Sequence, residues 1–149
     1  GVLAQRLAKR LCPKCKKAYH PDGDELSDLL DEYCTDLQLT TPFKEDAEAA
    51  RKAIARQWQD AFADKNGRFT LYKAVGCNDC TNGYRGRVGL HELMLGSDGA
   101  KKLVQERARV AELLALALEE GMRTLRQDGI EKVLTGVTDM IQVRKVCVR

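Results

Sequence analysis

Two pairs of cysteines, far apart in the chain, constrain the fold more than any other feature of this sequence. Cys12 and Cys15 form one pair, Cys77 and Cys80 form the other, and each pair encloses two residues. Two residues between thiolates let both sulfurs reach one tetrahedral ion at about 2.3 Å. Residues 16–76, which are 61 residues, separate the pairs, against about 15 to 20 in compact zinc ribbons. We therefore predict one structural zinc site made by all four cysteines, with a separately structured segment inside the loop that it closes.

Other chemistries of paired cysteines fit this sequence less well. Lys14, Lys16 and Lys17 place positive charge beside the first pair, which offsets the negative charge of a four-thiolate zinc centre. A thioredoxin-type redox pair should follow a buried strand and open a helix, and neither pair has that setting. Catalytic zinc needs an open position for water, which four thiolates do not leave. A thiol redox pair and an iron–sulfur cluster stay as alternatives.

The other two cysteines and the two histidines are predicted to be structural. Cys34 and Cys147 lie among apolar residues, and we interpret each as a small buried side chain. His20 precedes a proline at a predicted turn, and His91 lies in a predicted strand with its side chain outward. We therefore expect neither histidine to replace a cysteine as a ligand.

Charge and hydropathy exclude several classes of protein. The chain has 149 residues and a formal net charge of +3, which is too small by itself to indicate a nucleic-acid-binding surface. The longest apolar run, residues 113–118, is far shorter than the ~18 to 20 residues of a membrane-spanning helix. The N-terminus lacks the pattern of a signal peptide, so we expect a cytoplasmic protein. Because it has no initiator methionine, we also expect a segment of a longer chain.

Hydrophobic spacing predicts helices over much of the chain. Four apolar side chains fall on one face of a helix over residues 1–11: Val2, Leu3, Leu7 and Leu11. The strongly acidic segment 20–64 is predicted to be a helical hairpin that breaks at residues 40–42, with Asp22 or Asp24 as its first N-cap. We expect the acidic residues to form solvated outer faces, while a docking face for a basic partner is the alternative.

Two short strands and a C-terminal helical bundle complete the prediction. Residues 69–75 and 87–94 have the composition of strands, and the two could pair around the metal. From Ser97 onward the spacing is helical, Gly136 ends one helix, and Thr138 starts the last. The predicted fold class is α+β, mainly α with a small β element. It consists of a tetracysteine zinc-binding subdomain with a helical insert, followed by the helical bundle.

No supported catalytic constellation is present in the sequence. An enzyme needs a nucleophile with its base, paired carboxylates in a cleft, or a phosphate cradle. The segment most similar to a phosphate-binding loop is residues 96–101, and its spacing does not match Gly-x-x-x-x-Gly-Lys-Ser/Thr. We therefore predict that this segment is not itself an enzyme and has no catalytic or nucleotide-binding residue.

Four blocks of sequence surround and follow the cysteine pairs. They are Ala-Gln-Arg-Leu-Ala-Lys-Arg-Leu-Cys-Pro-Lys-Cys ending at Cys15, Gly-Cys-Asn-Asp-Cys ending at Cys80, Gly-Tyr-Arg-Gly-Arg-Val-Gly-Leu-His-Glu-Leu ending at Leu93, and Glu-Gly-Met-Arg-Thr-Leu-Arg-Gln-Asp-Gly ending at Gly129. In that order they resemble the C-terminal part of the bacterial type II secretion and type IV pilus assembly ATPases. Only the acidic insert, about residues 16–75, has no clear match.

The resemblance implies a parent protein with two nucleotide-binding lobes, which forms a cytoplasmic hexameric ring and uses ATP and Mg²⁺ to drive secretion or pilus assembly. It implies structural Zn²⁺ bound by Cys12, Cys15, Cys77 and Cys80. Residues 1–11 would end the ATPase core, residues 12–82 would form the zinc-binding subdomain, and residues 83–149 would form a C-terminal helical subdomain. The implied partners are the ATPase lobes, neighbouring subunits and platform proteins, through which the ring would be peripheral at the inner membrane. We expect Arg6 to be a surface arginine.

Two functions of other classes stay as alternatives. An independent nucleic-acid-binding zinc module could use Arg85, Arg87 and the basic stretch 6–17. Few aromatic residues interleave with these cations, however, and the acidic insert would repel phosphate. A thiol redox protein would use the two cysteine pairs. Thiol titration separates it from a zinc protein, because liganded cysteines stay unreactive until the metal is removed.

Overall fold

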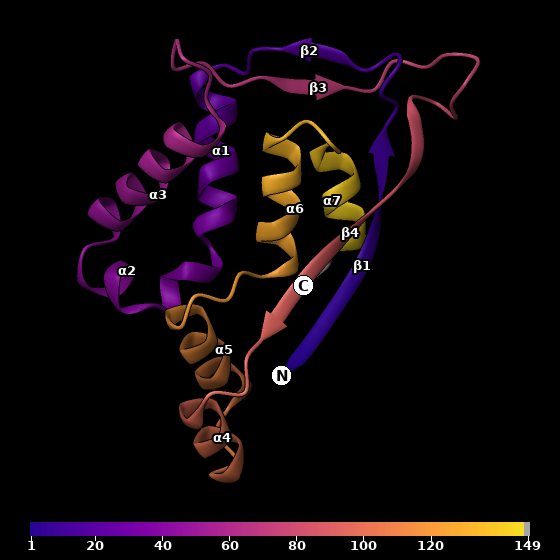
Figure 1. The fold of residues 1–149 in the computed structure, drawn as a ribbon. Coiled ribbons are helices and arrows are strands. Elements are labelled where there is room, and N and C mark those ends of the chain that lie inside the picture. The colour runs from indigo at the N-terminus through magenta and orange to yellow at the C-terminus, as the bar shows by residue number, and fades with distance from the viewer. Residues whose placement is uncertain (148–149) are drawn as a thin grey trace.

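Two pairs of strands and a set of helices make up residues 1–147, which are the residues that the computed structural model describes (Figure 1). In chain order the elements are β1 (Val2–Leu11), β2 (Lys17–Tyr19), α1 (Gly23–Cys34), the 3₁₀ helix η1 (Asp36–Leu39), α2 (Thr41–Glu45), α3 (Ala47–Phe62), β3 (Leu71–Lys73), β4 (Tyr84–Met94), α4 (Asp98–Gln105), α5 (Val110–Glu119), α6 (Leu125–Leu134) and α7 (Met140–Val146). The predicted α+β class, mainly helical, is confirmed. No helix within the described part of the chain is both long and apolar enough to cross a membrane.

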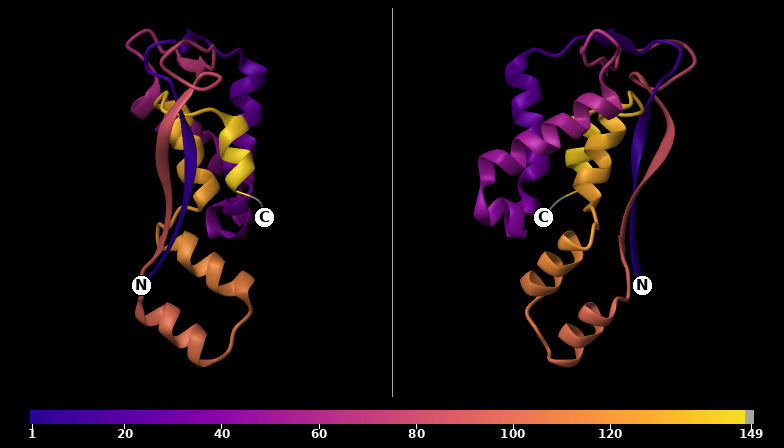
Figure 2. Two further views of the ribbon diagram at one scale, coloured as in Figure 1. Left: turned by 90° about the vertical axis from the view of Figure 1, so that its right-hand side faces the viewer. Right: turned by 60° about the vertical axis from the view of Figure 1, so that its left-hand side comes forward.

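β1 and β4 form a long antiparallel ribbon along one side of the molecule (Figures 1 and 2). The register begins with Val2 opposite Met94, and it shifts at an irregularity between Lys9 and Leu11. One face of the ribbon packs against α6 and α7, so Ala8 on that face is buried. The opposite face is open to solvent and carries large apolar side chains.

The predicted amphipathic helix over residues 1–11 is wrong. Leu3, Leu7 and Leu11 are four residues apart, and a spacing of four fits one face of a helix and also one face of a strand. Leu3 and Leu7 lie on the open face and are 59% and 50% exposed, whereas Leu11 is buried beyond the irregularity. β4 decides between the two structures, because it provides backbone hydrogen-bond partners along the whole segment.

The two short strands pair with each other and not with the ribbon. β2 pairs antiparallel with β3, from Lys17 opposite Lys73 to Tyr19 opposite Leu71. The predicted pairing of the strands at 69–75 and 87–94 is wrong, because β4 takes β1 as its partner. β1 leads through the first pair of cysteines into β2, and β3 leads through the second pair into β4. Each cysteine pair is therefore a turn that connects the two pairs of strands.

The acidic segment between the cysteine pairs forms the predicted helical hairpin from α1 and α3. Asp22 is the N-cap of α1, where its side chain accepts a 2.8 Å hydrogen bond from the Glu25 N–H. Pro42 lies in the first turn of α2, where it costs no helical hydrogen bond, so the predicted break contains a short helix. The rings of Tyr33 and Trp58 meet edge to face with centroids 5.3 Å apart, which joins α1 to α3.

α6 and α7 lie between the helical hairpin and the ribbon, and α4 and α5 project from one end of the molecule (Figures 1 and 2). Ile130 of α6, Val143 of α7 and Leu90 of β4 are fully buried in the core that they share. Gly129 permits the close approach of α6 and α7, because a Cβ there would lie 2.6 Å from Val143 Cγ1. The same cluster includes Leu29 of α1, so the core contains residues from both halves of the chain.

The ends of the C-terminal helices follow local capping rules. Gly136 lies just beyond α6 with φ +81°, so the predicted helix end is confirmed. Thr138 was expected to start the last helix, but α7 begins at Met140 with Asp139 as its N-cap. The Asp139 side chain accepts a 3.0 Å hydrogen bond from the Gln142 N–H, which holds the start of α7.

Gln127 is fully buried and ties α6 to the helical hairpin. Its Oε1 accepts a 2.8 Å hydrogen bond from the Thr124 N–H, in a capping box at the start of α6. Its Nε2 donates a 3.0 Å hydrogen bond to the Tyr33 carbonyl at the end of α1. One side chain thus satisfies backbone groups on two elements that are far apart in the sequence.

Replacing Gln127 with leucine should lower the free energy of unfolding by about 1–3 kcal/mol, because two buried backbone groups lose this partner. Urea unfolding followed by circular dichroism measures the change. Gln105→Leu, at an exposed position at the end of α4, is the matched control and should stay within about 0.5 kcal/mol of wild type. Equal losses in both variants would show that Gln127 has no special role.

Candidate metal centre

The structure brings the four paired cysteines together where the two pairs of strands connect. The Sγ atoms of Cys12 and Cys77 are 3.8 Å apart, and those of Cys15 and Cys80 are 3.7 Å apart. Within the second pair the Sγ atoms are 3.6 Å apart, and all four sulfurs lie within 4.8 Å of one another. Sulfurs at the corners of a tetrahedron, about 2.3 Å from its centre, are about 3.8 Å from one another. The cluster therefore has the dimensions of a four-thiolate zinc site.

Backbone groups around the cluster hold the two turns in place. The Gly76 N–H donates to Cys15 Sγ at 3.3 Å, and the Cys77 N–H donates to Cys80 Sγ at the same distance. Hydrogen bonds of this kind favour the thiolate over the thiol. The Cys12 N–H donates to the Gly83 carbonyl at 2.8 Å, which ties the first turn to the residues after the second.

Two glycines, Gly76 before the second cysteine pair and Gly83 after it, form tight turns. Gly76 and Gly83 have φ values of +118° and +93°, in the left-handed region where glycine carries no steric cost. At Gly83 there is also no room for a side chain, because a Cβ would lie 2.7 Å from the Cβ of Ala74. The chain reverses there and starts β4.

Burial and hydrogen bonding shift the pKa values of the Cys12 and Cys77 thiols in opposite directions. Burial raises the pKa of Cys12, but hydrogen bonds from the N–H groups of Lys14 and Cys15 and from neighbouring thiols outweigh it and lower the pKa to about 7. For Cys77, the Asp79 N–H lowers the pKa, whereas burial and the three neighbouring thiols together raise it to about 12. Four thiolates at these distances repel one another, so complete deprotonation requires a cation at the centre.

An exposed ion pair bridges the two cysteine turns. Lys14 Nζ lies 2.8 Å from Asp79 Oδ2, and both side chains are more than half exposed. Such a pair contributes less than about 1 kcal/mol to stability. The positive charge of Lys14 beside the cluster was expected from the sequence, but its partner Asp79 was missed. The available signal was the position of Asp79 inside the second pair, opposite a lysine inside the first.

The other residues singled out in the sequence do not join the sulfur cluster. His20 and His91 are exposed, and neither belongs to the group of neighbouring ligand atoms. Cys34 and Cys147 are buried, as predicted, and burial raises the pKa of Cys34 to about 11. Arg6 is exposed and donates a hydrogen bond to the backbone of its own neighbour, as a surface arginine does.

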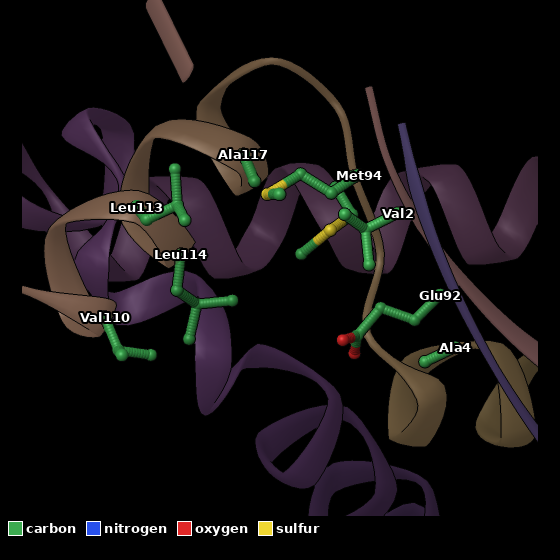
Figure 3. Close-up of a pocket in the computed structure, with 9 residues that line it drawn as sticks. Val2, Ala4, Glu92, Met94, Val110, Leu113, Leu114 and Ala117 are labelled. Atoms are coloured by element: carbon green, nitrogen blue, oxygen red, sulfur yellow. The ribbon is translucent and has the colours of Figure 1, made fainter. Parts of the chain in front are cut away.

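An apolar groove of about 400 Å³ lies between α5 and the end of the β1–β4 ribbon (Figure 3). One wall is a stripe along α5 formed by Val110, Leu113, Leu114 and Ala117. Val2, Ala4 and Met94 form the other wall, and Glu92 is the ionisable side chain among the lining residues. Glu92 Oε1 accepts a 3.0 Å hydrogen bond from the Leu125 N–H. One carboxylate held in this way is not an acid–base pair, so the groove has the character of a contact surface.

Comparisons with known proteins identify the family. A family model described as "Type II/IV secretion system protein" matches residues 1–145. The type IV pilus assembly ATPase PilB of Myxococcus xanthus is 38% identical over 144 residues, which are 95% of this chain and 20% of that protein. PilB of Pseudomonas aeruginosa is 31% identical over 97% of this chain and 20% of its own length. The type II secretion system ATPase E of Vibrio cholerae is 32% identical over 98% of this chain and 23% of its own length.

This chain therefore belongs to the type II/IV secretion system protein family. Its relatives within the family are pilus assembly and secretion ATPases. The chain spans about a fifth of the length of these relatives. The family resemblance read from the four sequence blocks is confirmed.

Thiol labelling should separate the six cysteines into two groups. In protein purified without chelators, all six should react slowly with a thiol reagent at pH 8. When a chelator is added, the four clustered cysteines should react first, as the metal leaves, while Cys34 and Cys147 should react only later, as the metal-free chain unfolds, because both are buried in the core. Mass spectrometry of labelled peptides assigns the sites. Fast labelling of Cys12, Cys15 or Cys80 before any chelator is added would contradict metal ligation.

Proposed function

We propose that this chain is a non-catalytic zinc-binding module of an ATPase that powers type II protein secretion or type IV pilus assembly. The observation that carries the proposal is the tetrahedral spacing of four sulfurs in a member of this family. The ligands would be Cys12, Cys15, Cys77 and Cys80. Bound zinc would supply two positive charges at the centre of four thiolates and leave no open coordination position, so its role is structural.

The proposed site closes the base of a long insertion. Residues 16–76 leave the first cysteine turn and return at the second, with α1, α2 and α3 between them. Ligation would hold the ends of this segment together and fix the two pairs of strands relative to each other. Because the four sulfurs come together only in the folded chain, metal binding would add on the order of 10 kcal/mol to folding.

We assign the parts of the chain as follows. Residues 1–11 end an ATPase core, residues 12–82 form the tetracysteine subdomain with its acidic insert, and residues 83–149 form a C-terminal helical subdomain. ATP and Mg²⁺ would bind to nucleotide-binding lobes outside this segment, in keeping with the ATPase names of the relatives. The module would work in a ring at the cytoplasmic side of the inner membrane, where platform proteins are the proposed partners of the ring.

The open face of the ribbon supports a contact with the ATPase lobes. Leu7 and Leu93 are each 50% exposed on this face, and Leu3 is 59% exposed beside them. Adjacent exposed apolar side chains of this size mark a protein contact surface. We propose that the ATPase lobes of the same polypeptide cover this face.

Metal analysis tests the zinc site directly. Wild-type protein purified without chelators should contain about one zinc per chain, because one tetrahedral site uses all four thiolates. Cys80→Ser should lose most of the zinc and the cooperative unfolding transition, whereas Cys34→Ser, a buried cysteine outside the cluster, should keep the zinc. Plasma emission spectrometry and circular dichroism measure both properties. Wild-type protein that is free of metal and still folded would overturn the proposal.

The contact with the ATPase lobes has a separate test. In the isolated chain, Leu7→Asp should change the free energy of unfolding by no more than about 0.5 kcal/mol, because the side chain already faces solvent. In a chain that also carries the ATPase lobes, the same change should lower ATP hydrolysis several-fold, because a charge enters the interface. Gln57→Asp, at an exposed position of α3, is the control and should leave hydrolysis unchanged. Equal hydrolysis in both variants would exclude this face as the contact.

A further inference from the structure

The turn between α6 and α7 lies beside the backbone that carries the cysteines, at the end of the molecule where β2 and β3 are found (Figure 1). The Leu11 N–H, immediately before Cys12, donates a 2.9 Å hydrogen bond to the Val137 carbonyl. Thr138 Oγ1 donates a 2.7 Å hydrogen bond to the Lys9 carbonyl, and the Thr138 side chain is 1% exposed. The turn therefore holds the last residues of β1 from one side.

Lys16 makes the second attachment, immediately after Cys15. Its Nζ donates a 2.8 Å hydrogen bond to the Gly136 carbonyl and lies 4.2 Å from the centroid of the Tyr72 ring. Gly136 itself packs on this ring, since a Cβ there would lie 2.6 Å from Tyr72 Cε1. The lysine side chain is thereby fixed between β3 and the α6–α7 turn, and this restrains the backbone of the first cysteine turn.

Tyr84 makes the third attachment, four residues after Cys80. Its hydroxyl donates a 2.5 Å hydrogen bond to Asp139 Oδ2. The same tyrosine pairs with Leu11 in the ribbon and exchanges backbone hydrogen bonds with Thr81. The α6–α7 turn is thus attached to the chain before the first cysteine pair, after the first pair and after the second pair.

We propose that residues 136–139 are a positioning element for the metal centre, an inference that rests on the proposed zinc site. The turn touches no sulfur. It acts by fixing the backbone at three places: at Leu11 before the first cysteine turn, at Lys16 after that turn, and at Tyr84 after the second cysteine turn. Partners that orient metal ligands from outside the ligand set typically change metal affinity about 10-fold to 100-fold when removed. Thr138 and Lys16 are the positioning residues that the contacts single out.

The coupling runs in both directions. If the turn strengthens metal binding, then metal binding must strengthen the docking of the turn by the same factor. The turn joins α6 to α7, and Arg144 of α7 pairs with Glu32 of α1. Metal ligation would therefore set the position of the C-terminal helices and, through them, of the helical hairpin. This assigns the zinc site a role beyond closing its own loop.

The test compares the rate of zinc release to a chromophoric chelator in the folded, zinc-loaded chain. Thr138→Val removes one hydrogen bond while keeping the shape, and it should speed release about 10-fold to 100-fold. Thr135→Val is its matched control, because the exposed Thr135 hydroxyl bonds only within the end of α6. Lys16→Met should also speed release, whereas Lys17→Met removes the same charge at an exposed neighbouring position and should not.

Cobalt substitution separates positioning from general loss of stability. In the Co²⁺-loaded chain, the thiolate absorption bands should change in Thr138→Val and Lys16→Met, because the ligand geometry changes. Gln127→Leu, which weakens the core away from the cysteines, should leave these bands unchanged, because it removes no contact with the backbone beside a ligand. Equal release rates for Lys16→Met and Lys17→Met, or spectra identical to wild type in both positioning variants, would overturn the inference. A wild-type chain without zinc would instead overturn the proposed function.

Discussion

The meeting of four sulfurs is the constraint on which the rest of this structure depends. The first cysteine turn leads from β1 into β2, and the second leads from β3 into β4. Both connections between the β1–β4 ribbon and the β2–β3 pair therefore pass through the sulfur cluster. Sulfur–sulfur distances of 3.6–3.8 Å place the two cysteine turns side by side. A long segment can then leave and return to the ribbon without changing the course of β1 and β4.

The helices form a core that does not depend on the cysteine turns alone. The edge-to-face contact of Tyr33 with Trp58 joins the two long helices of the insert. Gln127 then joins that hairpin to α6 through the Tyr33 carbonyl. Because α6 and α7 also pack on the ribbon, the inserted and C-terminal segments share one apolar cluster. The insert is therefore held at its base by the cysteine turns and along its length by α6.

The chain has two kinds of contact region: one that is held by hydrogen bonds within the chain, and one that exposes apolar side chains. The cysteine cluster and the α6–α7 turn are held by hydrogen bonds within the chain. The open ribbon face exposes Leu3, Leu7 and Leu93, and the groove beside α5 is lined by apolar side chains (Figure 3). The cysteine cluster and the α6–α7 turn are therefore separate from the surface that we propose to contact the rest of the protein. The relatives of this chain are secretion and pilus assembly ATPases.

The sequence by itself determined the cysteine turns, the family and most of the helices, because their signals are local. Two-residue spacing between thiolates, an Asp22 cap and a glycine after α6 act within a few residues. Tertiary structure alone decided that residues 2–11 are a strand, because a four-residue leucine spacing fits both a helix and a strand until β4 provides hydrogen bonds. It also decided that β3 pairs with β2, and that Thr138 and Lys16 join the α6–α7 turn to the chain on either side of the first cysteine pair. Those contacts join residues more than 50 positions apart, and no local pattern encodes which distant partner a backbone group will find.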